Sequence, residues 1–324
     1  HSGFFIRGDC VTYPEYDSCE LCPRRCHARR NEGKAGFCGA TSTLRVARSA
    51  LHFWEEPPIS GEAGSGAIFF TGCPLRCVFC QNHEISQEGF GLEVSTARLA
   101  QMMIELQEQG ALNINLVTPL HFAPHIREAL SLARAAGLCL PIVCNTSGYE
   151  TVESVRAMAD LVDIWLTDWK YEDPKVAGSL SAVKDYPQVA AGALAEMLAS
   201  LRRAGGRKVN DEGVMRRGII VRHLVLPGHV SDSLRVLDHV WQICGNECDL
   251  SVMNQYTPNE RCRKAGGNLA RALSNVEYEM VLDHADDLGF ENLWWQQGGT
   301  VSESFVPGFD ATGVEGPEVS VGRP

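Results

Sequence analysis

The stretch FTGCPLRCVFCQN, residues 70–82, contains three cysteines, Cys73, Cys77 and Cys80, at spacings of four and three. It overlaps the end of AIFFT, residues 67–71, an apolar run of the kind that forms buried strands. A closed iron–sulfur or zinc site usually takes four protein ligands. Three thiols in one loop therefore indicate either a distant fourth ligand or a metal site with one position left open on purpose.

Downstream of this three-cysteine loop, runs of strand type alternate with segments of helical periodicity. The strand candidates are residues 67–71, 113–117, 140–144, 162–167, 218–226 and 250–254. The helix candidates are residues 97–110, 123–137, 152–160, 186–205, 233–244 and about 268–288. Such alternation is typical of parallel strands joined by helical crossovers. Six units are fewer than the eight of a closed barrel, so the sequence predicts an α/β fold with an open, partial (β/α)6 TIM-type barrel.

Two segments flank this predicted barrel, which we place at residues 51–297. Residues 1–50 are rich in Cys, Arg and Gly and hold eight Lys or Arg against five Asp or Glu. We expect them to form a small, cysteine-rich metal-binding lobe. Residues 298–324 are rich in Gly, Val, Pro and acidic residues, which predicts an extended tail with Phe305 and Phe309 as anchors.

Composition and charge restrict the function classes. The formal net charge of −11 makes nucleic acid an unlikely partner. No apolar run approaches the length that crosses a bilayer, and HSGFFIRGDC lacks the pattern of a signal peptide, so we expect a cytoplasmic protein without a membrane partner. Eight of the thirteen cysteines lie in the first 80 residues. In a large cytosolic protein, clustered cysteines bind metal or carry out redox chemistry more often than they form disulfides.

Polar residues follow most of the strand candidates. In a parallel β/α barrel, chemistry takes place at the carboxyl ends of the strands. The residues that follow the strands are the three-cysteine loop, Thr118-Pro119-Leu120-His121, Asn145-Thr146-Ser147-Gly148, Asp168-Trp169-Lys170 and Gln255-Tyr256, with Arg222 and His223 inside the fifth strand. A purely structural barrel needs no such set. Glu55 and Glu56, before a Gly-rich loop, are interpreted either as a solvated turn or as contacts to a cofactor or substrate.

The spacing C-x3-C-x2-C resembles the signature of the radical S-adenosylmethionine (SAM) superfamily. Its flanks, Phe70, Gly72, Leu75 and Asn82, are similar to the cluster loop of glycyl-radical-enzyme activases, including pyruvate formate-lyase activating enzyme. The chain also resembles a subgroup of this superfamily that is named pyruvate formate-lyase-activating-enzyme-like. The segments that carry this resemblance are CELCPRRCHARRNEGKAGFCG, HFWEEPPISGEAGSG, INLVTPLH, NTSGYE, DIWLTDWKY, VRHLVLPG and MNQYTPN. The resemblance implies a partial (β/α)6 barrel, one oxygen-sensitive [4Fe–4S] cluster and SAM.

The resemblance also implies a chemistry for the three-cysteine loop. Cys73, Cys77 and Cys80 would ligate three irons, and the amino and carboxylate groups of SAM would chelate the fourth. One electron from the cluster would cleave SAM to methionine and a 5′-deoxyadenosyl radical, which would take a hydrogen atom from the substrate. The protein would supply position, and the cofactor would supply reactivity.

Several further residues are predicted to bind SAM because of their place in the family pattern. Phe79 would lie near the adenine, and Lys170 of the D-x-K pair Asp168 and Lys170 would meet the SAM carboxylate. Thr118 stands where activases have Gly-Gly-Glu, so its Oγ or backbone carbonyls would accept hydrogen bonds from the SAM amino group. The remaining predicted contacts are Asn145, Thr146, Ser147 and Gln255.

Two of these positions depart from the activase pattern. Asn145 replaces the Asp of the D-T-N-G segment, which argues against a charge-dependent role there, such as cation binding. Gln255-Tyr256 replaces a Tyr-His pair, so a histidine contact to SAM is missing from this position.

A second cysteine group precedes the barrel and consists of Cys19, Cys22, Cys26 and Cys38. Two interpretations of this group stay open, a structural zinc site and an auxiliary [4Fe–4S] cluster; unligated buried thiols are the simpler alternative. His27 and Cys10 are substitute ligands. In activases with extra clusters the added cysteines follow the radical SAM loop, whereas here they precede it, so that analogy does not transfer.

The sequence thus predicts a cytoplasmic radical SAM enzyme, an oxidoreductase of anaerobic chemistry. The first hypothesis for its substrate is a glycine of a partner protein, a glycyl-radical enzyme, which would need a wide barrel mouth. The alternatives are radical modification of a small molecule or another substrate, and a non-enzymatic iron–sulfur or zinc protein. The expected electron donor is a flavodoxin or ferredoxin.

Overall fold

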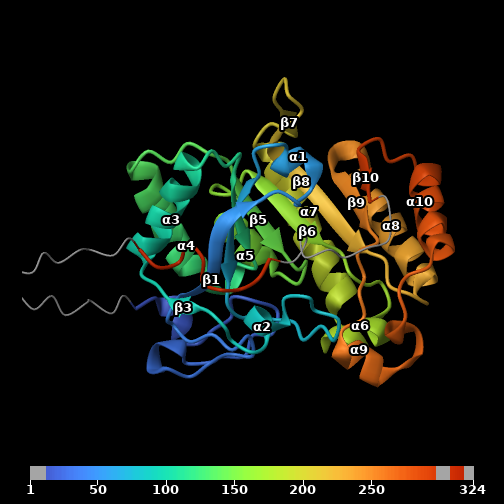
Figure 1. Cartoon of the computed structure of the whole chain (residues 1–324), viewed down its shortest axis with the longest axis horizontal. Helices are drawn as coiled ribbons and strands as arrows, with labels where there is room; N and C mark the ends of the chain where they lie inside the picture. The colour runs from blue at the N-terminus through green and yellow to red at the C-terminus, as the bar shows by residue number, and fades with distance from the viewer. Residues whose placement is uncertain (1–11, 297–306, 317–324) are drawn as a thin grey trace, which may run out of the picture.

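A computed structural model describes residues 12–296 and 307–316 of the chain, and Figure 1 shows its arrangement. One open sheet has the strand order β10-β9-β8-β6-β5-β4-β2-β1-β3. All six predicted strands are present and pair in parallel with their neighbours. They are β2 (Ser65–Phe70), β4 (Ile114–Val117), β5 (Ile142–Thr146), β6 (Ile164–Asp168), β8 (Met215–Leu224) and β9 (Asp249–Met253). The predicted α/β fold with a partial barrel is therefore confirmed.

Four short or edge strands were not predicted. β10 (Leu293–Trp295) adds a parallel strand beside β9, and β1 (Arg45–His52) pairs antiparallel with β2 at the other edge. β3 (Leu92–Glu93) pairs with β1, and β7 (Lys208–Val209) pairs with β8. Among the described residues no strand pairing joins β10 to β1 or β3, so the barrel is open between its two edges.

The six predicted helices are α3 (Thr96–Glu108), α4 (Ala123–Ala135), α5 (Val152–Met158), α7 (Tyr186–Arg203), α8 (Val230–Cys244) and α10 (Asn275–Leu288). α10 begins at Asn275 rather than near residue 268, because Ser274 and Glu277 form a capping box there. The first part of the predicted helix is instead the 3-10 turn η5 (Gly267–Ala270). Not predicted were α1 (Pro57–Ser60), α2 (His83–Ser86), α6 (Pro174–Ser181), α9 (Glu260–Ala265) and the turns η1 (Pro14–Tyr16), η2 (Arg30–Glu32), η3 (Leu120–Phe122) and η4 (Gly245–Glu247).

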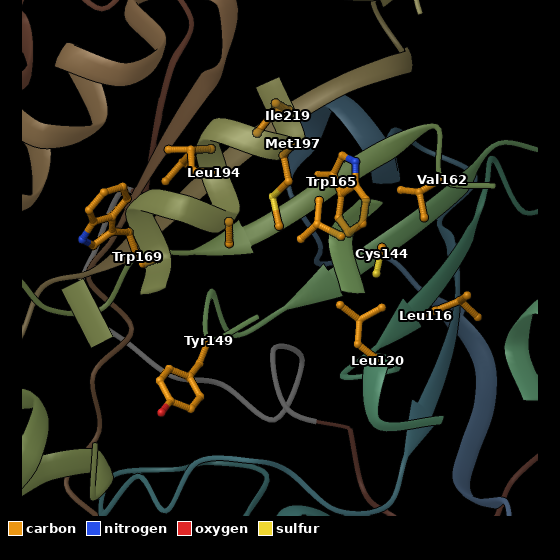
Figure 2. Close-up of a cluster of buried hydrophobic side chains, with 14 of the residues drawn as sticks. Leu116, Leu120, Cys144, Tyr149, Val162, Trp165, Trp169, Leu194, Met197 and Ile219 are labelled. Atoms are coloured by element: carbon orange, nitrogen blue, oxygen red, sulfur yellow. The ribbon is translucent and has the colours of Figure 1, made fainter. Parts of the chain in front are cut away.

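The main core lies between the parallel strands and the helices. Alternate residues of a strand face opposite sides of a sheet. Figure 2 shows Leu116, Cys144, Trp165 and Ile219 from four neighbouring strands in one cluster with Leu194 and Met197 of α7. A smaller cluster on the other face contains Val143, Leu166 and Ile220 and is closed by Ile59 of α1. The polar residues of that inner face come after this apolar cluster along each strand, nearer the carboxyl ends of the strands.

The segment of residues 307–316 returns to the β1 edge of the sheet. The Ser49 amide donates to the Thr312 carbonyl (2.9 Å), Arg48 pairs with Asp310 (2.8 Å), and the ring of Phe309 lies 5.5 Å from that of Phe69. The predicted anchor Phe305 and the rest of the predicted tail lie outside the described residues. No helix in the described part of the chain is long and apolar enough to span a membrane.

Candidate functional site

A cavity of about 680 Å³ lies where the carboxyl ends of the parallel strands meet. The structure brings eleven of the predicted site residues to its wall. They are Cys73, Cys77, Phe79, Cys80, Thr118, Asn145, Thr146, Ser147, Asp168, Lys170 and Gln255. The four cysteines of the N-terminal lobe do not line this cavity.

Three other residues of the rim point away from the cavity. His121 is buried and bonds to the Thr71 carbonyl (2.8 Å), and burial together with Arg30 lowers its pKa to about 3. His223 is held between the Trp169 carbonyl (2.7 Å) and Ser233 (2.9 Å). The Trp169 ring is buried against His239, 4.9 Å away. All three are structural groups whose hydrogen-bonding or packing partners are protein.

The three-cysteine loop leaves the end of β2 through Gly72. This glycine has φ +95, and a Cβ there would lie 2.7 Å from the Cys38 carbonyl, so the turn requires glycine. Hydroxyl groups approach two of the sulfurs: Ser181 Oγ lies 2.9 Å from Cys77 Sγ, and Ser86 Oγ lies 3.3 Å from Cys80 Sγ. Donors of this kind stabilise thiolates, which are the form that binds iron.

The protonation of these thiols depends on burial and on one lysine. Burial raises the pKa of Cys77 to about 11, while Lys170 acts in the opposite direction. Burial also raises the pKa of Cys73. Metal-free, the buried loop thus favours neutral thiols; metal binding would convert them to thiolates and release protons. Three thiols, hydroxyl donors and a neighbouring lysine fit a cluster held by three cysteines.

A partly buried ion network lies beside the loop at the ends of β5, β6 and β8. The Asp168 carboxylate receives Lys170 Nζ at 2.5 Å on one oxygen and Arg222 Nε at 2.9 Å on the other. The Arg222 guanidinium also donates to Asn145 Oδ1 (2.7 Å). Burial opposes ionisation of Asp168, but Arg222 and Lys170 outweigh it and hold the pKa of the carboxyl below its usual range. Arg222 thus ties the ends of three strands together.

Two carboxylates from the loop after β1 extend this network. Glu55 lies 3.7 Å from Arg222, and both Glu55 and Glu56 line the cavity. Burial raises the pKa of Glu56 to about 7, although Arg222 and a hydrogen bond with Ser251 oppose the shift. The sequence left two interpretations of this pair, a solvated turn and a contact to a cofactor or substrate. The second fits the geometry, because both carboxylates line the cavity and Glu55 lies near Arg222. Arg222 was not among the predicted site residues; its signal was an arginine within an otherwise apolar strand.

Two residues near Asn145, Thr118 and Gly148, have left-handed backbone conformations. Thr118 has φ +55, a left-handed conformation that is an outlier for a β-branched residue and typical of functional sites. Its amide donates to the Asn145 carbonyl (2.8 Å). Gly148 has φ +76, and a Cβ there would lie 2.0 Å from the Asp168 carbonyl. Both turns therefore fix where the polar ends of β4, β5 and β6 stand.

Gln255 offers an acceptor to the cavity. Its Oε1 is buried and has no hydrogen-bond partner among the described residues. Its backbone carbonyl accepts from Gln81 of the segment after the three-cysteine loop (3.0 Å). The neighbouring Tyr256 packs edge-on against Phe79, with ring centroids 6.2 Å apart. A buried acceptor without a partner is costly, which fits a site completed by a ligand with donor groups, such as the SAM amino group.

None of the four cysteines of the N-terminal lobe forms a disulfide with another described residue. His27, a predicted substitute ligand, instead faces Ser18 (3.1 Å) and Glu20 (3.2 Å), and Cys10 lies outside the described residues. Across residues 12–296 and 307–316, no three Cys, His, Asp or Glu side chains converge as a ready-made site for a single metal ion.

Comparison with known proteins identifies the family. The model of the family described as "Radical SAM superfamily" matches residues 67–234, just over half of the 324 residues. The chain belongs to the radical SAM superfamily. Membership implies a [4Fe–4S] cluster and SAM as cofactors and supports SAM-dependent radical chemistry. The non-enzymatic alternative is therefore set aside.

Two relatives are similar in sequence. "Uncharacterized protein MJ0674" of Methanocaldococcus jannaschii is 27% identical over 288 residues, which cover 86% of this chain and 77% of that protein. The pyruvate formate-lyase-activating enzyme of Listeria monocytogenes is 27% identical over 129 residues, which cover 37% of this chain and 52% of the enzyme. The chain thus matches about half the length of the activating enzyme.

Solved structures of Streptococcus suis SuiB are similar at a lower level. SuiB bound to S-adenosylmethionine has a TM-score of 0.48 and 14% identity, covering 72% of this chain and 50% of SuiB. SuiB bound to the precursor peptide SuiA has a TM-score of 0.47 and 13% identity, covering 69% of this chain and 46% of SuiB.

Proposed function

We propose that this radical SAM enzyme activates a partner protein by removing a hydrogen atom from one of its glycines, which leaves a glycyl radical. The observation that carries the proposal is the convergence of three thiols and a partly buried Asp168–Lys170–Arg222 network on one cavity. Partial similarity to a pyruvate formate-lyase-activating enzyme supports the choice of substrate. The predicted roles of the individual side chains are part of this proposal.

The cofactors supply the reactive chemistry: when bound, the cluster gives one electron that cleaves a carbon–sulfur bond of SAM, yielding methionine and a 5′-deoxyadenosyl radical. Cys73, Cys77 and Cys80 would hold the cluster. Lys170 would move from Asp168 to the SAM carboxylate, while Arg222 keeps Asp168 neutralised. The buried Oε1 of Gln255 would accept a hydrogen bond from the SAM amino group.

The apolar part of the cavity wall would protect the radical. Phe69, Leu75, Val117, Leu224 and Met253 line the cavity between the polar groups. Their side chains would exclude water from the space next to the three-cysteine loop. A primary carbon radical abstracts hydrogen from most C–H bonds. The C–H bond of the substrate glycine must therefore be held closer to the radical carbon than the side chains of the cavity wall are.

The mouth of the cavity carries exposed aromatic side chains that suit a protein substrate. Phe53 is 51% exposed, Trp54 57% and Trp295 55%, and all three line the cavity. Exposed aromatics next to a cavity are typical of surfaces that bind other proteins. Phe53 and Trp54 directly follow β1 and Trp295 is the last residue of β10, the two sides between which the barrel is open. A loop of a partner protein would therefore enter between these edges.

The electron would come from a flavodoxin- or ferredoxin-type protein in the cytoplasm. A cluster with one iron open to a small ligand in a solvent-connected cavity is exposed to oxygen, which supports an anaerobic setting. These assignments belong to the same proposal as the substrate.

Deuterium transfer tests the proposal. Cells of the source organism are grown on glycine deuterated at the α-carbon, and their protein fraction is incubated without oxygen with the reconstituted enzyme, SAM and dithionite. We expect deuterium in 5′-deoxyadenosine, and an electron paramagnetic resonance signal of a carbon radical in the protein fraction that is a doublet after growth on unlabelled glycine and collapses to a single line with the deuterated glycine, because the doublet comes from the remaining α-hydrogen. The control is the Cys73→Ala/Cys77→Ala/Cys80→Ala variant, which should produce neither. Unlabelled 5′-deoxyadenosine from the same incubation would contradict a glycine substrate.

A small-molecule substrate is the second candidate, and the carboxyl pair favours it. Glu55 and Glu56 line the cavity on the side of Arg222 and suit a ligand with an amino or hydroxyl group. The low-molecular-weight fraction of the same labelled cells distinguishes the two substrates. Deuterium transferred from that fraction, and none from the protein fraction, would replace the activase hypothesis.

A further inference from the structure

The end of α6 is bound directly to the three-cysteine loop. The amide of Arg76 donates to the Ser181 carbonyl (3.2 Å), and the amide of Val78 donates to the Leu180 carbonyl (2.9 Å). Cys77 lies between these two amides in the chain, so both bonds hold it next to Ser181, the last residue of the helix. The position of Ser181 relative to Cys77 is thus fixed by the backbone of both segments.

Two hydroxyl groups form a chain that ends at the Cys77 sulfur. Ser181 Oγ lies 2.9 Å from Cys77 Sγ and 2.7 Å from the hydroxyl of Tyr171. Ser181 and Tyr171 are both 0% exposed, so bulk water does not compete for these contacts. In the part of the chain that the structure describes, neither hydroxyl has a further hydrogen-bond partner.

Iron binding at Cys77 would fix the direction of both hydrogen bonds. A thiolate bound to iron carries no proton and can only accept, so the single hydroxyl hydrogen of Ser181 must point to the sulfur. Ser181 Oγ then has only acceptor positions left, and the hydroxyl of Tyr171 must donate to it. A hydroxyl that accepts a hydrogen bond becomes a stronger donor, because each bond in such a chain polarises the next.

The other two sulfurs of the loop have simpler donors. The Leu75 amide lies 3.5 Å from Cys73 Sγ, and Ser86 Oγ lies 3.3 Å from Cys80 Sγ. Among the described residues no second hydroxyl bonds to Ser86 Oγ. Of the three sulfurs, Cys77 therefore has the shortest contact with a donor, and a second hydroxyl strengthens that donor.

We propose that Ser181 and Tyr171 are positioning residues that raise the reduction potential of the cluster held by Cys73, Cys77 and Cys80. Reduction adds one negative charge to a cluster and its sulfurs, and a hydrogen-bond donor at a sulfur stabilises that charge. The hydroxyl chain therefore makes reduction by a one-electron donor more favourable. The inference rests on the proposed binding of a cluster by these three cysteines and is independent of the substrate that the radical attacks.

Tyr171 also belongs to the segment that carries the ion network. It directly follows Lys170 after β6, and its carbonyl accepts from the indole of Trp169 (3.2 Å). Lys170 contacts Asp168, whereas the hydroxyl of Tyr171 contacts Ser181. One short segment thus positions both the lysine proposed to meet SAM and the hydroxyl that supports the donor to Cys77.

The reduction potential of the cluster tests the inference without any need for catalytic activity. The protein is reconstituted without oxygen and titrated with dithionite in the absence of SAM. The titration follows the electron paramagnetic resonance signal of a [4Fe–4S]⁺ cluster that is absent from the Cys73→Ala/Cys77→Ala/Cys80→Ala variant. For Ser181→Ala we expect the equilibrium constant for reduction to fall about tenfold, equal to a potential about 59 mV more negative. Tyr171→Phe leaves Ser181 in place and should lower the constant by less, about threefold.

A double variant shows whether Tyr171 acts through Ser181. For Ser181→Ala/Tyr171→Phe we expect the potential of Ser181→Ala alone, because no serine hydroxyl is left for Tyr171 to polarise. Tyr149→Phe is the matched control, since Tyr149 is also buried but its hydroxyl donates to Asp185 (2.9 Å). Its potential should equal that of the wild type.

The outcomes separate this inference from the assignments on which it rests. Equal potentials in the wild type and Ser181→Ala, at equal iron and sulfide content, would overturn the inference. A further fall in the double variant, as large as that of Tyr171→Phe alone, would overturn the chain from Tyr171. A wild type without the cluster signal would overturn the assignment of the cluster to this loop, and the inference with it. The glycine substrate is tested separately by the deuterium experiment.

Discussion

Each cysteine group of this protein lies beside an arginine that is largely removed from solvent, and the two arginines have different partners. Next to the three-cysteine loop, Arg222 donates to the Asp168 carboxylate at 2.9 Å. In the N-terminal lobe, Arg30 meets two backbone carbonyls and the sulfur of Cys19. The charges next to the three-cysteine loop are therefore paired with each other within the chain, before any cofactor binds. The second arginine has no carboxylate partner among the described residues and is held by backbone carbonyls and an aromatic ring instead.

The largest expected effect separates the three-cysteine loop from the other cysteines. Cys77→Ala should reduce 5′-deoxyadenosine formation to background, because a cluster that loses one of three thiolates is not held. Cys139→Ala is the matched control, since Cys139 is exposed, lies outside the cavity and bonds only to Gln107. Activity retained by Cys77→Ala would show that this loop does not hold the SAM-binding cluster.

The two arginines give the sharpest test of the comparison. Arg222→Met removes a partner of a buried carboxylate, so it should lower the free energy of unfolding by about 3–5 kcal/mol, with or without metal. Arg30→Met leaves the buried carbonyls of Thr41 and His121 without their donor, so it should lower the free energy of unfolding by a smaller amount, about 1–3 kcal/mol. Denaturant unfolding without oxygen, before and after chelation, measures both.

Arg222→Lys provides the control for that test. The lysine keeps the charge beside Asp168 but loses the second donor to Asn145, so we expect an intermediate loss of stability. If Arg30→Met costs as much free energy of unfolding as Arg222→Met, a carboxylate partner is not what distinguishes the two arginines, and the contrast between the two sites fails.

A smaller effect is expected from the turn that supports Asp168. In Gly148→Ala the new Cβ would lie 2.0 Å from the Asp168 carbonyl at φ +76, so the strand end must move and SAM affinity should fall about tenfold, equal to about 1.4 kcal/mol. Gly137→Ala is the control, because Gly137 also has positive φ (+101) but a Cβ there meets nothing within 4 Å. It should cost only the left-handed conformation, about 1 kcal/mol of stability, and leave SAM binding unchanged. Equal SAM affinities for the two variants would show that this contact does not position the site.

The sequence predicted the parallel strands well because each is a continuous apolar run with a helix of clear periodicity after it. It predicted the cavity residues for a related reason: the polar residues that follow parallel strands must meet at one end of a barrel. β1 and β10 were missed. β1 runs across mixed polar residues at a sheet edge, and β10 has only three residues, so neither carries a pattern that a single sequence reveals.

Arg222 and Arg30 show what a sequence does not contain. Arg30 is one of several arginines in its lobe and Arg222 one of three in β8, and what sets them apart comes from partners 91 and 54 positions away, the His121 carbonyl and Asp168. Spacing reveals ligands that share one loop, such as Cys73, Cys77 and Cys80. Charge compensation between distant strands and loops is a property of the folded chain, and it needed the structure.

The smallest expected effect concerns the two carboxyls that face Arg222, which should respond to pH with opposite sign. The pKa of Asp168 lies below its usual range, so its contribution to stability is present above the unfolded-state pKa and is lost as the pH falls. The pKa of Glu56 is raised from 4.5 to about 7, so the native state binds more protons than the unfolded state between these values. Stability linked to Glu56 is therefore lost as the pH rises through this window.

Glu56→Gln should remove that loss, because the amide imitates the protonated carboxyl at every pH. Relative to the wild type, the variant should gain about 1–2 kcal/mol of unfolding free energy between pH 5 and pH 8, less than full burial would give because Glu56 is only partly buried. Denaturant unfolding at a series of pH values measures the difference, and Glu62→Gln, on the exposed surface nearby, is the control with no expected slope. A difference that stays flat from pH 5 to pH 8 would mean that Arg222 keeps Glu56 ionised as it keeps Asp168, and that the whole network, not only its aspartate, is charged before SAM arrives.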